Sequence, residues 1–334
     1  MMPITRRAIK VWGWSALFFF LCLVIAPLIG PQPLNLRDAW QHRSDPVTST
    51  DAAILFHARL PRILFAALAG AALSAAGVAF QALLRNPLAT PYTLGVSSGA
   101  ACGAVLGMLI GFHQTMIGIP AIQISGIFGA LLTIWLVYWL GKKTGGHTHT
   151  LLLSGVTLSF FFAAIIMFLQ YLADFTQSYR IVHWLMGNLD IAGYDTVILT
   201  APGVIIGIFL LWARSSEYNL LSAGEVSAQS RGVNIKLNQQ ITYIAASLTV
   251  ALIVCITGPI GFVGLIVPHT LRQISGSDHR ILMPASTLCG AGFLVLCDTL
   301  ARTLFAPAEL PVGVLTSILG GPFFLYILLA RKKV

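Results

Sequence analysis

The chain alternates long apolar stretches with short polar connections. A helix that crosses a membrane needs about 20 predominantly apolar residues. Ten stretches reach or approach this length, at 11–30, 60–83, 93–112, 116–140, 150–172, 194–213, 238–257, 259–275, 281–303 and 312–330. The pattern predicts an all-α, polytopic membrane protein, with ten transmembrane helices tightly packed in a single transmembrane domain over residues 1–334.

Small and helix-breaking residues refine this prediction. Alanines recur at 67, 71, 75 and 79, and Gly70 and Ser74 continue a neighbouring stripe. Such stripes are typical of helices that pack backbone to backbone in a membrane. The eighth stretch contains several glycines and prolines, so we expect it to be short, bent or preceded by a re-entrant turn.

Composition excludes a soluble class. Hydrophobic residues make up 57% of the chain and charged residues 9%, whereas soluble domains are about half apolar and a quarter charged. The net charge of +9 then indicates basic cytoplasmic loops rather than nucleic-acid binding. With a cytoplasmic N-terminus, ten spans place 14 of the 20 Lys and Arg on the cytoplasmic side, and the C-terminus returns there.

Motifs for catalysis, metal binding and ATP binding are missing from the sequence. "GKKTGG" at 141–146 lacks the spacing of a phosphate-binding P-loop. The cysteines show no C-x-x-C spacing, and His147 and His149 have no third ligand nearby. We therefore expect no catalytic residue, metal or cofactor in this chain, and an energy source on another chain.

Acidic residues are scarce within the apolar stretches. Asp298 is the clear example, and Arg302 follows four residues later, so the two can pair along one helix face. An ion-coupled secondary transporter normally needs more intramembrane carboxylates, which weighs against that class. A membrane enzyme or scaffold would need a catalytic cluster that the sequence does not show.

The longest polar interruption, 214–240, carries Gly224, Ala228 and Gly232 at intervals of four. On a helix these would form a smooth strip that another backbone could approach. The alternative is a solvated loop with a short helix.

Four long motifs occur in order along the chain: "ARLPR" at 58–62, "RNPLATPYTLGVSSGA" at 85–100, "GPIGFVGLIVPHTLRQISGSDHR" at 258–280 and "AELPVGVLTSILGGPFF" at 308–324. In these motifs the sequence resembles the FecCD family, the type II permeases of binding-protein-dependent ABC importers for iron chelates, haem and cobalamin. The resemblance covers almost the whole chain.

The resemblance implies partners and a location. Family members lie in the bacterial inner membrane and work in pairs, as homodimers or heterodimers. Two ATPase subunits, which bind the ATP, dock below the pair, and a periplasmic substrate-binding protein docks above. Gly224, Glu225, Ala228 and Gly232 match the cytoplasmic coupling helices that contact the ATPase.

The resemblance also implies roles for individual side chains. Arg59, Arg62 and Arg302 match arginines that meet acidic residues of the binding protein, although such arginines can also simply reach the membrane interface. Ser154 and Thr157 match a region that lines the translocation path and its gate. The turn with Asp278 matches a signature near the cytoplasmic face.

The cargo is not fixed by these motifs. A ferric siderophore is the first expectation, and haem and cobalamin are the alternatives within the family. An ion-coupled carrier remains the alternative of a different class.

Overall fold

The computed structural model describes residues 4–43, 49–111, 115–116, 119–143, 148–191 and 193–330, and it is almost entirely helical. A helix covers most of each of the ten predicted stretches: α1 (Ile4–Ile25), α4 (Leu60–Leu83), α5 (Val96–Ile110), α6 (Ala121–Lys143), α7 (Thr148–Leu172), α9 (Asp195–Ala213), α12 (Ile235–Thr257), α13 (Val263–Ser275), α14 (His279–Thr303) and α15 (Val312–Ala330). His147 and the side chain of His149 lie outside the described residues.

Shorter elements connect these helices. They are η1 (Ala26–Leu28), α2 (Leu36–Gln41), α3 (Thr50–Ala53), the π-helical turn η2 (Ile54–Arg59), η3 (Tyr92–Leu94), a hairpin of β1 (Thr115–Met116) and β2 (Ile119–Pro120), α8 (Phe175–Leu185), α10 (Ser215–Ser222) and α11 (Glu225–Ser230). Helix α8 lies between two of the predicted stretches, 150–172 and 194–213. The capping box between Asp174 and Gln177, which opens α8, is the signal that would have predicted this helix.

The helices are those of a multi-pass membrane protein. Within the described residues, seven helices are long and apolar enough to cross a membrane. The helices α5, α13 and α15 are shorter or less regular, so the count of ten remains a prediction. The eighth stretch is short, as expected, because α13 has only 13 residues and begins at Val263.

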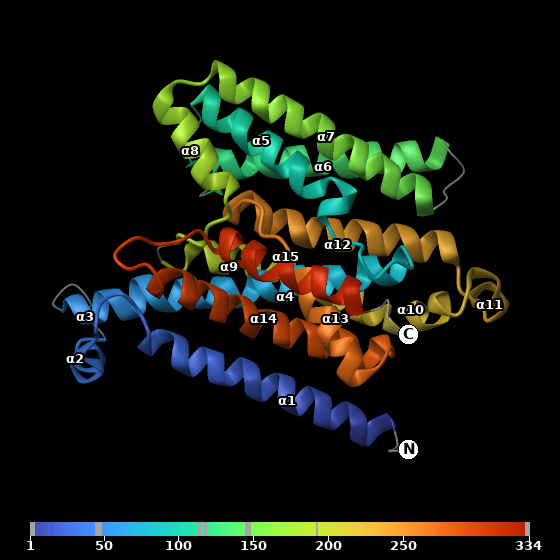
Figure 1. The fold of residues 1–334 in the computed structure, drawn as a ribbon, viewed down its shortest axis with the longest axis horizontal. Coiled ribbons are helices and arrows are strands. Elements are labelled where there is room, and N and C mark those ends of the chain that lie inside the picture. Colours follow the sequence, from blue (N-terminus) through green and yellow to red (C-terminus); the bar gives the residue numbers. More distant parts are fainter. Residues whose placement is uncertain are drawn as a thin grey trace.

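Helix α4 forms the centre of the bundle and is buried along almost its whole length. It packs against α14, α13, α12 and α9 (Figure 1). Gly70 lies against the carbonyl of Gly290 on α14, and Gly77 lies against the carbonyl of Gly264 on α13. The predicted small-residue stripe is confirmed, because an added methyl group at either position would collide with backbone.

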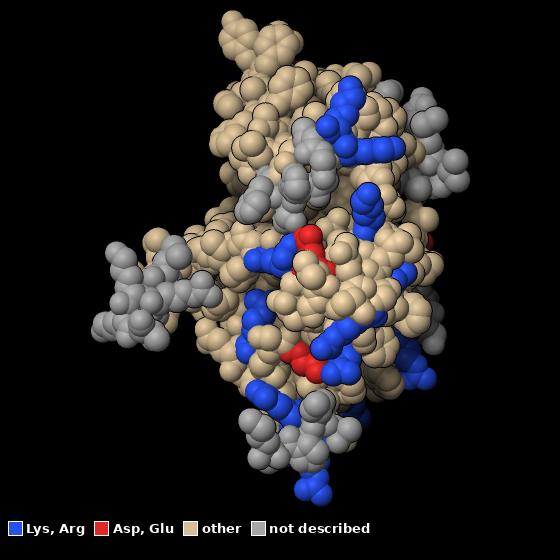
Figure 2. All heavy atoms as spheres, turned by 90° about the vertical axis from the view of Figure 1, so that its right-hand side faces the viewer, with Lys and Arg blue, Asp and Glu red and all other residues tan. Residues whose placement is uncertain are grey.

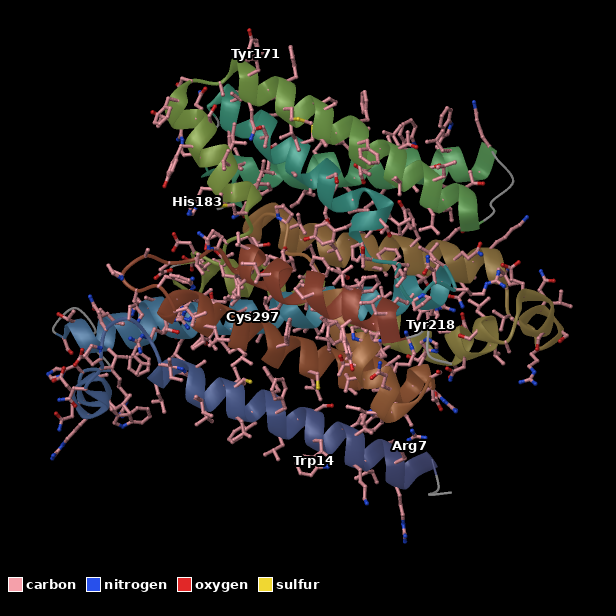
Figure 3. All side chains as sticks on the ribbon, in the orientation of Figure 1. Arg7, Trp14, Tyr171, His183, Tyr218 and Cys297 are labelled. Atoms are coloured by element: carbon pink, nitrogen blue, oxygen red, sulfur yellow. The ribbon has the colours of Figure 1, made fainter. Side chains whose placement is uncertain are left out.

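Two helix groups flank this centre. Helices α5, α6 and α7, with α8 across one end, form one edge of the molecule, and α1 forms the other edge beside α14 (Figure 1). Trp14 on α1 and Tyr171 on α7 point outward at opposite edges (Figure 3) and are 72% and 85% exposed. A folded chain with such large apolar faces needs lipid or another apolar partner to cover them.

The two ends of the bundle differ in charge. Helix α1 begins, and α15 ends, at the end that carries α10 and α11 (Figure 1). Viewed from this side, the surface shows many Lys and Arg side chains and few Asp and Glu (Figure 2). We call this the basic end, and the other end, with α2 and α3, the opposite end.

Candidate functional site

A cavity of about 760 Å³ lies where four segments of the chain meet. The segments are the loop around η3, the end of α8, the start of α13 with the residues before it, and the first half of α15. The lining includes Thr90, Tyr92, Phe262, Val314 and Ser317, and none of its lining residues is Asp, Glu, Lys, Arg or His. Its walls are therefore mainly apolar, with a few hydroxyl groups.

Phe262 has an unusual backbone at this cavity. Its φ is +66°, in the left-handed region that non-glycine residues rarely adopt. Its ring lies directly against Gly320 of α15, where a methyl group would come within 2.2 Å of the ring. Helix α13 therefore starts inside the bundle, with an aromatic side chain held between it and α15.

The predicted path residues Ser154 and Thr157 lie elsewhere, on α7. Neither belongs to the cavity lining. The hydroxyl of Ser154 donates to the carbonyl of Thr150 in its own helix, at 2.7 Å, and Thr157 is exposed. Their assignment to a translocation path stays a prediction.

Arg62 and Arg302 belong to a buried ion cluster at the opposite end. Arg62 Nε lies 3.0 Å from Asp298 Oδ1, and Arg302 Nε lies 3.0 Å from Asp298 Oδ2. The predicted pairing of Asp298 with Arg302 is thus confirmed. Arg62 Nη1 also lies 2.8 Å from Glu309 Oε2, in the loop between α14 and α15. We call Arg62, Asp298, Arg302 and Glu309 the arginine cluster.

Burial distinguishes the members of the arginine cluster. Arg62 and Arg302 are only 8% and 3% exposed, and Asp298 is fully buried. The side chain of Glu309 is 45% exposed. Arg302 Nη2 is buried and has no hydrogen-bond partner in the described structure. The cluster thus holds one buried donor without a partner and one accessible carboxylate.

Arg59 does not belong to the arginine cluster and instead contacts the segment that follows α1. It is 4% exposed, and its Nη1 donates to the carbonyl of Pro27 at 2.8 Å. Its Nη2 donates to the carbonyl of Gln32, and the guanidinium lies against Gly30. Arg59 therefore fastens the segment after α1 to the start of the long second span. Docking by Arg59, Arg62 and Arg302 stays a prediction, and a partner would have to meet them at the exposed edge formed by Glu309.

The predicted smooth strip in 214–240 is wrong. Helix α11 has only six residues, so Gly224 and Gly232 lie outside it, with φ of +119° and +83°. Ala228 is fully buried beside Leu221 and Ile235. The spacing of four was misleading because the two glycines lie on either side of α11 and are not part of the helix.

A different residue of α11 faces outward. Val226 is 82% exposed at the basic end. The sequence pattern does not indicate this residue, because a single valine in a polar stretch carries no periodic signal. Glu225, by contrast, forms an ion pair with Arg85, in the turn after α4. The contact to a partner would therefore involve Val226 and the exposed residues near it.

Helix α10 is fastened to the start of α14. Asn219 Nδ2 donates to Asp278 Oδ1 at 2.7 Å, and Asn219 Oδ1 accepts the backbone N–H of His279 at 2.8 Å. The hydrogen bond from the Arg280 side chain, with a further one from Asn219, lowers the pKa of Asp278 to about 2. Asp278 is therefore ionised at neutral pH and caps α14. The sequence indicated Asp278 and its neighbours, but Asn219 gave no signal.

Within the described residues, no group of three or more His, Cys, Asp or Glu side chains is placed to hold a metal ion. The cysteines are all free.

Proteins of known structure or known sequence resemble this chain over almost its whole length. A solved structure described as an inward-facing metal-chelate type ABC transporter superposes with a TM-score of 0.83 at 32% identity, covering 96% of this chain and 99% of that one. An uncharacterized ABC transporter permease, YvrB of Bacillus subtilis, is 43% identical over 98% of this chain and 95% of its own length. The hemin transport system permease HmuU of Yersinia pestis is 35% identical over 95% of each chain.

The fold is therefore that of an ABC transporter permease. The model of the FecCD transport family matches residues 17–330, and the chain belongs to that family.

Proposed function

We propose that this chain is the membrane permease of a binding-protein-dependent importer for an iron chelate, with a ferric siderophore as its cargo. The observation that carries the proposal is the cavity of about 760 Å³, whose lining contains no charged residue. A space of this size is within the range of small-molecule sites. Walls without charge suit a bulky chelate that is recognised by its carrier protein and released into the path.

ATP hydrolysis belongs to a separate pair of ATPase subunits in this proposal. Their docking surface is the basic end, around α11, where Val226 offers an exposed apolar side chain. The predicted coupling residues contribute in different ways: Gly224 and Gly232 shape the ends of α11, and Ala228 anchors it. The basic end then faces the cytoplasm, which agrees with the rule that cytoplasmic loops are rich in Lys and Arg.

A periplasmic binding protein would dock at the opposite end, on the arginine cluster. Guanidinium groups form strong, directional bonds with carboxylates. Arg62 is only 8% exposed but is joined to the surface through Glu309, whose side chain is 45% exposed. Glu309 lies at the entrance, where an incoming carboxylate would compete with it for Arg62.

A second permease copy would complete the path. The cavity lining includes Ile318, which is 59% exposed on α15, so the cavity borders an apolar outer face. Covering such a face with a second copy is the simplest arrangement, because two-fold pairs of identical subunits are the commonest kind of oligomer among soluble proteins. A heterodimer with a sister chain is the alternative.

The proposal is tested by reconstituting the chain with its ATPase and its binding protein in proteoliposomes. Uptake of a labelled ferric siderophore, haem or cobalamin is measured with each protein omitted in turn. We expect siderophore uptake that requires both ATP and the binding protein. Uptake of haem or cobalamin instead would change the assigned cargo and leave the importer function in place. Uptake that survives without ATP but is lost when ion gradients collapse would indicate a secondary transporter and overturn the proposal.

A further inference from the structure

One ion pair at the basic end joins two segments that are 140 residues apart. Arg85 lies in the turn after α4, and Glu225 is the first residue of α11. Both side chains are partly exposed, at 41% and 44%. An ion pair with this exposure contributes little to folding stability, so stability alone is a poor explanation for it.

The backbone of Arg85 supports a functional reading. Its φ is +46°, in the left-handed region that costs free energy for a residue with a side chain. Residues held in this way concentrate at functional sites, where the surrounding structure fixes them. Here the strained turn aims a charged side chain at α11.

The segment that follows Arg85 leads directly into the cavity wall. We call residues 86–93 the cavity loop. Four of its members, Leu88, Thr90, Tyr92 and Thr93, line the cavity. The membrane permits irregular backbone of this kind where it is buried in protein or lines a cavity.

The cavity loop is internally bonded, so it can move as a unit. Asn86 Oδ1 accepts the backbone N–H of Leu88 at 3.0 Å. The hydroxyl of Thr93 donates to the carbonyl of Thr90 at 2.7 Å, and the N–H of Thr93 donates to the same carbonyl at 3.1 Å. A displacement of Arg85 would therefore displace Tyr92 as well, because these bonds hold the cavity loop together.

We propose that Arg85 and Glu225 form the link through which a movement of α11 repositions the cavity loop. Both are positioning residues, because neither touches the cavity. Glu225 then faces into its own chain, and the contact to the ATPase is left to Val226 and its neighbours. This inference rests on the proposed function, in which an ATPase moves α11.

The first test measures cargo imported per ATP hydrolysed, in the complete transporter in proteoliposomes. We compare wild type with Arg85→Ala, Glu225→Ala and the charge swap Arg85→Glu with Glu225→Arg. Each single variant should lower the ratio by about fivefold or more, as expected for the loss of a coupling between two sites, while ATP hydrolysis continues. The charge swap should restore most of the ratio, because it rebuilds the pair with opposite polarity.

The second test reads the cavity loop directly. In a variant without the native cysteines, Leu88→Cys is labelled with a maleimide in the presence and absence of nucleotide. Nucleotide should change the labelling rate with Arg85 present and leave it unchanged in Arg85→Ala. Lys143→Ala, which removes a positive charge from the same end, is the matched control and should behave as wild type.

The possible outcomes distinguish a failure of this inference from a failure of the proposed function. If the wild-type complex shows no ATP-dependent uptake, the proposed function fails. If the wild type imports cargo, and both single variants keep its ratio and its labelling response, the link between Arg85 and Glu225 is wrong. A charge swap that is no better than the single variants would also contradict it.

Discussion

The side chain of Asp298 pairs with two buried arginines. Its carboxylate lies within 3.0 Å of two guanidinium groups, those of Arg62 and Arg302, in a fully buried position. Burying charges is expensive unless they are paired. Asp298 therefore makes it possible to hold two arginines inside the bundle, while Glu309 adds a fourth charge at the accessible edge. Changing Arg62 or Arg302 would disturb the fold, so Glu309 is the better residue for a test of docking.

We predict that Glu309→Gln tightens binding of the periplasmic binding protein. Removing the competing charge makes Arg62 Nη1 more available to the partner, while Arg62 Nε stays paired with Asp298. A change of about 1.4 kcal/mol corresponds to a tenfold change in Kd. We expect an effect of about three- to tenfold, measured by titrating the binding protein onto the permease in nanodiscs. Glu217→Gln, an acid at the basic end, should leave the Kd unchanged. A weaker complex with Glu309→Gln would show that Glu309 itself contacts the partner.

At the scale of elements, helix contacts depend on glycines that face backbone. The closest case is between α4 and α13, where a methyl group at Gly77 would lie 2.0 Å from the carbonyl oxygen of Gly264. A backbone atom cannot move aside as a flexible side chain can. Helix α13 starts at the cavity, so this contact also sets the position of Phe262.

We predict that Gly77→Ala destabilises the permease. Overpacking of this kind costs about 1–3 kcal/mol, and it should lower the thermal unfolding midpoint in detergent. The control is Gly13→Ala in α1, where nothing lies within 4 Å of the added methyl group. That change should be neutral or stabilising, since Ala favours a helix over Gly by about 0.5–1 kcal/mol. Equal midpoints for the two variants would argue against the close packing of α4 and α13.

Helix α11 has one side packed against its own chain and another side exposed. Ala228 faces inward and is fully buried, while Val226 faces outward. We predict that Val226→Asp prevents co-purification of the ATPase with the permease, because a charge would replace the apolar contact. Val226→Leu should preserve the complex, and Ile9→Asp on α1, at the same end, should preserve it as well. Full ATPase recovery with Val226→Asp would place the docking surface elsewhere.

At the scale of the whole molecule, charge and shape define an orientation. The end with α10 and α11 shows many Lys and Arg side chains at its surface (Figure 2), whereas Arg62 and Arg302 at the opposite end are buried. Basic surface residues favour the cytoplasmic side. In the proposed function, the two docking surfaces would therefore lie on different sides of the membrane, as an importer driven from the cytoplasm requires.

The orientation is tested by labelling single cysteines in intact cells with a membrane-impermeant maleimide. In a variant without the native cysteines, Phe175→Cys at the start of α8 should be labelled from outside. Arg231→Cys, just after α11, should be labelled only after the cells are permeabilised. The reverse pattern would invert the orientation and exclude both docking assignments.

The sequence by itself determined the class of the molecule and the place of its helices. Lipid leaves no partner for backbone N–H and C=O groups, so a long apolar stretch in a membrane must be helical. Local signals also sufficed for the pairing of Asp298 with Arg302 and for the shortness of α13, because each depends on residues close together in the chain.

Only the tertiary structure decided which distant residues meet. Arg62 and Asp298 are 236 positions apart, and Arg85 and Glu225 are 140 apart. These distances in sequence leave no periodic trace, because the pairs form only once particular helices pack. The direction of Val226 and Ala228 on α11, and the residues that line the cavity, follow in the same way from where neighbouring helices lie.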